Sequence, residues 1–283
     1  MERECFLTVL IALLGGSTLL ACGWWPAGQT SQGSAGCLER LMWRRIWWTF
    51  MPALIVAAWL CGWALVEPDP VPERVPAAVL LLSVPFLLLF TRAAIRAGWS
   101  LFRDDGDPGT ATVGLLKPWI MFSPHLAKAL DDRALEAALE HERAHARHRD
   151  PLRIWLAQLV TDLQWPWPQA RERFRAWIVA LELARDEDAR AAGADGSDLA
   201  AAILAAARLR QHAVMSPVAA LIGQESVLKQ RLACLLTPLA DQAEEIRAWW
   251  PQPWILAPVL LIAVMLGSEF GEIVVRTLLR IAA

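Results

Sequence analysis

Two histidines and a glutamate within five residues have the spacing of a hydrolytic metal site. The stretch from 139 to 150 reads LEHERAHARHRD, and it places His141 and His145 four residues apart. On a helix, residues at i and i+4 share one face, so both imidazoles could reach one Zn²⁺. Glu142 would lie beside the metal, where it could take a proton from a water that the metal activates. The motif therefore predicts metal-assisted hydrolysis with Glu142 as the base.

The alternative for this stretch is a charged, solvated helix face, because glutamate and arginine are also frequent in it. We favour the metal site because an HExxH sequence on a predicted helix is uncommon by chance. Asp131 or Asp132 is placed to cap this helix at its start. Asp150-Pro151 is placed to end it.

A catalytic zinc needs a third protein ligand and an open coordination position. The later segment LELARDEDARAAG places Glu182 and Asp186 on one face of a second predicted helix. We expect Glu182 to bind the metal and Asp186 to hydrogen-bond a ligand histidine and so fix its tautomer. The alternative is that both are surface acids, paired with Arg185 and Arg190.

Other titratable residues near the motif are weaker candidates for ligands. His148 is expected to point along the helix toward solvent, and His125 follows a proline in a loop. Glu187 and Asp188 are expected to fall on other faces of their helix. We place Asp150 with Asp186, behind the metal ligands.

The composition predicts a membrane protein. Hydrophobic residues make up 56% of the chain, and they come in blocks. Four blocks approach the roughly 20 apolar residues that a spanning helix needs. Many of the 16 tryptophans stand at the ends of such blocks, as in an interfacial aromatic belt. The predicted spans are Cys5–Trp25, Ile46–Val66, Val75–Ile95 and Pro253–Val275.

The distribution of arginine predicts the orientation in the membrane. Arginines gather after the first and third predicted spans, at Arg40, Arg44, Arg45, Arg92, Arg96 and Arg103. The positive-inside rule then places residues 96–250 in the cytoplasm and both termini outside. No basic run interleaved with aromatics occurs, so direct nucleic-acid binding is not expected.

A competing signal lies at the end of the first apolar block. The sequence STLLAC, ending at Cys22, is typical of a lipoprotein cleavage box. A signal peptide has a positively charged start, whereas this chain begins with one arginine, Arg3, between two glutamates, Glu2 and Glu4. A lipid-anchored periplasmic protease is therefore an alternative to a protein with four spans. The five cysteines are widely spaced and predict no disulfide framework.

The region between the third and fourth spans shows signals for further elements. DDGDPGTATVG, residues 104–114, is predicted to be a loop, and Trp119–Ser123 a strand. Residues 152–163 have the pattern of an amphipathic helix, which we expect on or in the bilayer surface. Pro168 should begin a helix that ends near Gly193, and Ser197 should cap a helix to about Arg210.

These residues together resemble the BlaR/MecR family of membrane zinc metallopeptidases, and more distantly the HtpX and Ste24 proteases. The resemblance is close over about 112–210 and loose for the four-span layout. It implies a mainly α polytopic protein with a zincin-like metallopeptidase domain of helices and a short edge strand or hairpin. It also implies that His141, His145 and Glu182 bind zinc with Asp186 behind them. An extended substrate would pair with the strand that holds Trp119, Ile120 and Met121.

The resemblance implies a domain order and a function. We expect a membrane domain at 1–96, a zinc metallopeptidase domain at 97–250, and a fourth span with a short tail at 251–283. The chain would be a zinc endopeptidase of the bacterial cytoplasmic membrane, with its active site facing the cytoplasm. Its substrate would be a protein, such as a transcriptional repressor or the chain itself, and a separate sensor protein could be its partner. The alternative is a zinc-holding membrane adaptor that cleaves nothing, with His148 as a fourth ligand.

The sequence also departs from this family. Only a few residues follow the fourth span, so antibiotic sensing by this chain itself is not expected. The family often reads ELACDDA where this chain reads ELARDEDA, with Arg185 in place of the cysteine. The chain has no tyrosine, so His212 or an arginine would have to stabilise an oxyanion.

Overall fold

The computed structural model describes residues 2–25, 34–66, 77–102, 110–213, 219–237 and 256–282. This part of the chain is mainly helical, as expected, with a single two-stranded sheet. The membrane-side elements are α1 (Glu2–Leu10), η1 (Ile11–Gly15, a π-helix), α2 (Gly16–Gly23), α3 (Ala35–Val66), α4 (Ala77–Phe102) and α11 (Leu256–Ala282). The remaining elements are β1 (Thr110–Val113), β2 (Trp119–Phe122), α5 (Pro124–Ala129), α6 (Asp132–His148), α7 (Asp150–Leu163), α8 (Pro168–Ala191), α9 (Gly196–Ala213) and α10 (Ala219–Leu236).

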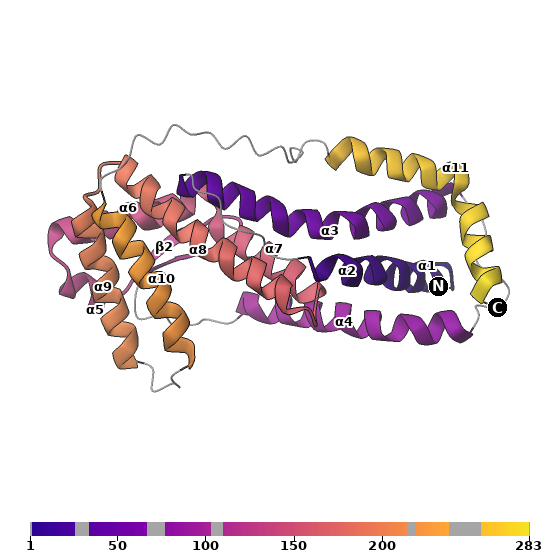
Figure 1. The fold of residues 1–283 in the computed structure, drawn as a ribbon, viewed down its shortest axis with the longest axis horizontal. Helices are drawn as coiled ribbons and strands as arrows, with labels where there is room; N and C mark the ends of the chain where they lie inside the picture. The colour runs from indigo at the N-terminus through magenta and orange to yellow at the C-terminus, as the bar shows by residue number, and fades with distance from the viewer. Residues whose placement is uncertain are drawn as a thin grey trace.

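Four helical segments of the described chain are long and apolar enough to cross a membrane, and they indicate a membrane protein. They are Phe6–Gly23, Ala35–Val66, Ala77–Leu101 and Ala257–Leu278. The prediction of four spans is therefore confirmed, with helices that extend beyond the predicted bounds at several ends. These helices form one half of an elongated molecule (Figure 1), and α5, α6, α9 and α10 form the opposite end. Both termini lie at the membrane-helix end.

Helices α3 and α11 pack closely because glycines stand at their contact. A Cβ atom on Gly267 would lie 1.9 Å from the carbonyl oxygen of Trp59. A Cβ on Gly62 would lie 2.1 Å from the carbonyl oxygen of Val264. Small residues of this kind let the backbones of membrane helices approach each other, and van der Waals packing then holds them. The second and fourth spans are thereby held together.

The N-terminal half of α3 packs on helices α7 and α8. It begins at Ala35, before the predicted span at Ile46, because the Glu187 carboxylate accepts hydrogen bonds from the Ala35 and Gly36 N–H groups. These are N–H groups that no helical carbonyl can satisfy. Beyond them, α3 shares a hydrophobic core with α7 and α8. Its buried members are Met42, Ile46, Ala157, Val160, Trp177, Ala180 and Leu181. The domain boundary at residue 97 stays a prediction.

The structure corrects two sequence predictions, one at the hairpin and one at the start of α9. Thr110–Val113, predicted as loop, forms β1 and pairs antiparallel with β2, with Thr112 opposite Ile120. The sequence prediction missed this strand because glycine, aspartate and proline dominate residues 104–109, directly before four residues that include strand-forming types. Asp195 rather than Ser197 caps α9, because its carboxylate accepts from both the backbone N–H and the hydroxyl of Ser197. The strand predicted from Trp119 is confirmed as β2.

The end of the first span packs against α8. Arg173 of α8, 2% exposed, donates to the carbonyl oxygens of Gly23 and Trp25. A Cβ on Gly23 would lie 2.5 Å from the Trp167 ring. Cys22 lies inside α2 next to these contacts. The lipoprotein alternative stays a prediction.

Candidate metal centre

Helix α6 carries the HExxH motif and is fixed at both ends. Asp131 caps it by accepting a 2.8 Å hydrogen bond from the Ala134 N–H. At the other end Arg149 adopts the left-handed conformation, with φ of 53°, and the chain turns directly into α7. A residue other than glycine rarely adopts this φ. The tight turn brings Asp150, the first residue of α7, back against His145.

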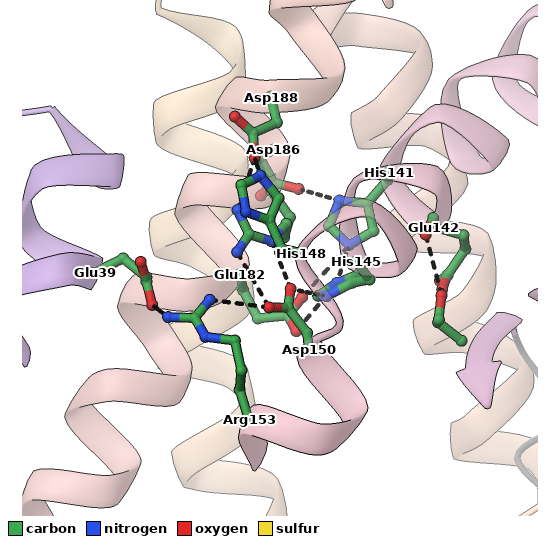
Figure 2. Close-up of polar contacts among 12 residues, drawn as sticks. Glu39, His141, Glu142, His145, His148, Asp150, Arg153, Glu182, Asp186 and Asp188 are labelled. Carbon is green, nitrogen blue, oxygen red and sulfur yellow. Dashed lines mark hydrogen bonds and ion pairs between the residues drawn. The ribbon is translucent and has the colours of Figure 1, made fainter. Parts of the chain in front are cut away.

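Three side chains converge at one point between α6 and α8 (Figure 2). The Nε2 atoms of His141 and His145 lie 3.1 Å apart. The Glu182 carboxylate lies 3.6 Å from His141 Nε2 and 3.8 Å from His145 Nε2. Ligand atoms about 2.0–2.1 Å from a tetrahedral zinc would lie about 3.3 Å from one another. The triad that the sequence pointed to is thus brought together at close to the separation that one zinc ion requires.

The far sides of both imidazoles face carboxylates. His145 Nδ1 lies 2.9 Å from Asp150 Oδ2, and His141 Nδ1 lies 3.0 Å from Asp186 Oδ1. An ionised carboxylate only accepts hydrogen bonds, so it favours the proton on the Nδ1 that faces it, through a hydrogen bond for His145 and through an ion-pair contact for His141. When the rings are neutral, both Nε2 lone pairs therefore point at Glu182 with no donor of their own. Three acceptors this close repel one another unless a cation lies among them, so the residues fit a bound divalent metal.

Glu142 lies on the side of α6 that faces the hairpin (Figure 2). It is 6% exposed, and its Oε2 lies 2.8 Å from the hydroxyl of Thr112 in β1. The same hydroxyl lies 3.1 Å from the Glu142 carbonyl oxygen. Thr112 thus fixes the carboxylate that the motif assigns as the base. Sequence reasoning missed Thr112, because only the strand pairing places it beside α6.

Burial and neighbouring charges set the protonation of the site. Burial disfavours a charged His141, but its contacts with Asp186 and Glu182 outweigh this and raise its pKa to about 9. Burial likewise disfavours a charged Glu182, yet Arg231 and His141 hold its pKa well below the usual range. Asp150 is buried too, and His145 and Arg185 lower its pKa to about 2. The carboxylates are therefore ionised at neutral pH, and without metal a proton occupies His141.

Arg231 of α10 is a second residue that the sequence did not single out. Its guanidinium makes two hydrogen bonds to Asp186, of 2.8 and 2.7 Å, and lies 2.8 Å from Glu182. It holds both carboxylates and offsets part of their charge. The alternative that Glu182 and Asp186 are surface acids paired with Arg185 and Arg190 is wrong, since Asp186 is 3% exposed and pairs with Arg231. No spacing rule connects position 231 to the motif.

Arg185, the departure from the family sequence, has a defined place. It is 3% exposed, and it donates to both oxygens of Asp150 at 2.5 and 3.1 Å. It also contacts Asp188 at 2.7 Å. Asp150, which is fully buried, thus lies behind His145 as predicted and is held by an arginine from α8.

The remaining predicted residues lie away from the triad or stay untested. His148 Nε2 lies 3.2 Å from Asp188 and is half exposed, and His125 is exposed on α5. The side chain of His212 lies outside the described residues. In β2, Trp119 and Met121 are exposed and Ile120 is half-buried, so a substrate strand could reach them, and their role stays a prediction.

Comparison with known proteins matches the region that holds this centre. Residues 108–235 match the family model described as BlaR1 peptidase M56. The match includes α6, α8 and Arg231, and it ends before the fourth span. Searches of curated proteins and of solved structures give no match.

Proposed function

We propose, from the match of residues 108–235 to the BlaR1 peptidase M56 family, that this chain is a membrane-embedded zinc endopeptidase. The family bears out the resemblance seen in the sequence and indicates a membrane metallopeptidase. The observation that supports the finer proposal is the convergence of His141, His145 and Glu182 beside Glu142. These are the ligands and the base that hydrolysis of a peptide bond needs.

The side chains divide the work of hydrolysis among them. A bound zinc would polarise the scissile carbonyl and acidify a water. Asp150 and Asp186 hold the two imidazoles with Nε2 free for the metal. Glu142, fixed by Thr112, accepts a proton from the attacking water and returns it to the leaving amine. Arg231 keeps Glu182 and Asp186 ionised and in place.

The proposal extends to location and substrate. The four spans and the arginine distribution support a bacterial cytoplasmic membrane with the site on the cytoplasmic side. The exposed hairpin supports a protein substrate bound as an added strand, such as a transcriptional repressor or the chain itself, with a separate sensor as a partner. The second candidate is a zinc-holding adaptor without activity. The contact of His148 with Asp188 gives that candidate little support, because it leaves no fourth protein ligand among the described residues.

The experiment compares wild type, Glu142→Gln and Glu140→Gln, each tagged and expressed in bacterial membranes. Glu140 is the matched control, because its carboxylate pairs with Arg143 on the outer face of the same helix. Cleavage of the chain or of an added unfolded protein, with zinc measured in the same samples, is the readout. We expect wild type and Glu140→Gln to cleave, and Glu142→Gln to keep zinc without cleaving. Equal cleavage by Glu142→Gln would overturn the proposal.

A further inference from the structure

A row of charged side chains, buried except for the half-buried Arg153, runs from the membrane helix α3 to the candidate metal ligand His145. Glu39 of α3 pairs with Arg153 of α7, Arg153 donates a 3.0 Å hydrogen bond to Asp150, and Asp150 contacts His145. Figure 2 shows this row from Glu39 to His145. Glu39 lies outside residues 108–235, so the family match does not include it.

Glu39 is buried and is held by contacts with two side chains. It is 5% exposed, although it is a charged residue near the start of the membrane helix α3. Besides Arg153 it accepts a 2.9 Å hydrogen bond from the Trp177 Nε1. The guanidinium of Arg153 lies 4.7 Å from the ring centre of Trp43 and 5.7 Å from that of Trp177. Buried charges are rare unless they are paired, so these contacts define one position for the pair.

The balance of charge around the Asp150 carboxylate depends on Glu39. Asp150 faces two arginines, Arg153 and Arg185, and its single negative charge cannot balance both. Glu39 balances Arg153, and Asp188 contacts Arg185. Without Glu39, an unbalanced positive charge would remain beside Asp150. That charge would draw the carboxylate away from His145 and disfavour a second cation nearby.

We propose that Glu39 of the membrane helix α3 is a positioning residue for the metal centre, acting on His145 through Arg153 and Asp150. The inference rests on the proposed metal centre and adds its dependence on the membrane domain. Since α3 also packs closely on α11, a shift of this helix pair would move Glu39 and weaken the hold on His145. The affinity for metal would then report the position of a transmembrane helix.

The test measures zinc affinity of the full chain in detergent by competition with a chromophoric chelator, which needs no proteolytic activity. Residues that orient metal ligands typically change affinity about 10–100-fold, and we expect Glu39→Gln to weaken zinc binding about tenfold. Glu39→Asp should recover part of this loss. Glu187→Gln is the control, because Glu187 also holds α3 but has no contact with Asp150. It should leave zinc affinity unchanged.

A double-mutant cycle separates the proposed route from a general loss of structure. Arg153→Lys keeps the charge but cannot bridge Glu39 and Asp150 with a fixed fork, so it should also weaken zinc binding. The double variant should be no weaker than the single ones, since both act through one route. Wild-type affinity in Glu39→Gln, an equal loss in Glu187→Gln, or additive losses would each overturn the proposal. The zinc assay does not depend on proteolysis, so a wild type that binds zinc but cleaves nothing in the cleavage assay would refute the proposed function and leave this proposal standing.

Discussion

The affinity of the site for metal should depend steeply on pH, because metal and proton compete for His141. The pKa of His141 in the metal-free protein is about 9, as burial is outweighed by Asp186 and Glu182. Zinc needs the neutral ring, so binding must release this proton. At pH 7 about one molecule in a hundred has the ring neutral, which weakens apparent binding about 100-fold relative to a fully neutral ring, or about 3 kcal/mol.

The sign of the effect follows from the raised pKa. As the pH rises toward about 9, the proton leaves and affinity should increase about tenfold per pH unit, then level off. Asp186→Asn removes the carboxylate that contributes most to holding the proton, so affinity should level off at a lower pH. The plateau should also lie lower, since the imidazole is less well oriented.

The assay is a zinc titration of detergent-solubilised apoprotein between pH 6 and 9.5, against a chelator whose own protonation is known. The pH change on adding zinc in a weakly buffered solution gives an independent count of the protons that zinc displaces. A flat affinity between pH 7 and 9 in wild type would refute the reasoning. So would an unchanged pH dependence in Asp186→Asn.

Two further predictions concern the base and the membrane packing. Thr112→Val should lower the rate of peptide hydrolysis about tenfold, because it removes a hydrogen bond to a charged group, and the zinc content should stay unchanged. A loss of zinc equal to the loss of rate would show that the hydroxyl supports the fold instead. Gly267→Ala should lower the thermal stability in detergent, because its Cβ would meet the Trp59 carbonyl at 1.9 Å. Gly98→Ala is the control, with open space around its Cβ position, and equal shifts in both variants would contradict the packing argument.

The candidate ligands of the proposed metal centre could be found in the sequence because they follow helical periodicity. His141 and His145 share a face by their spacing, and the same rule pairs Glu182 with Asp186. The four spans follow from the length of their apolar blocks. Local signals also limited the cap of α6 to Asp131 or Asp132 and ended the helix before Asp150-Pro151, and the structure has the cap at Asp131 and the end at His148.

The residues that hold the centre could not be found in this way. Thr112 and Arg231 contact its residues from a strand and a later helix, and Glu39 contacts Arg153 from a membrane helix. Their contacts depend on how whole elements pack, and no local pattern records that packing. The same limit applies to the start of α3 at Ala35, which a carboxylate from α8 determines.

The measurement that tests the account most directly is zinc X-ray absorption on the purified full chain, with metal per chain counted in the same sample. The account predicts one zinc, with nitrogen and oxygen ligands at about 2.0–2.1 Å and the signature of two imidazoles. Glu182→Gln should lose most of this zinc, because it removes one of the three ligands. A sulfur ligand near about 2.3 Å, or full zinc content in Glu182→Gln, would contradict the assigned centre.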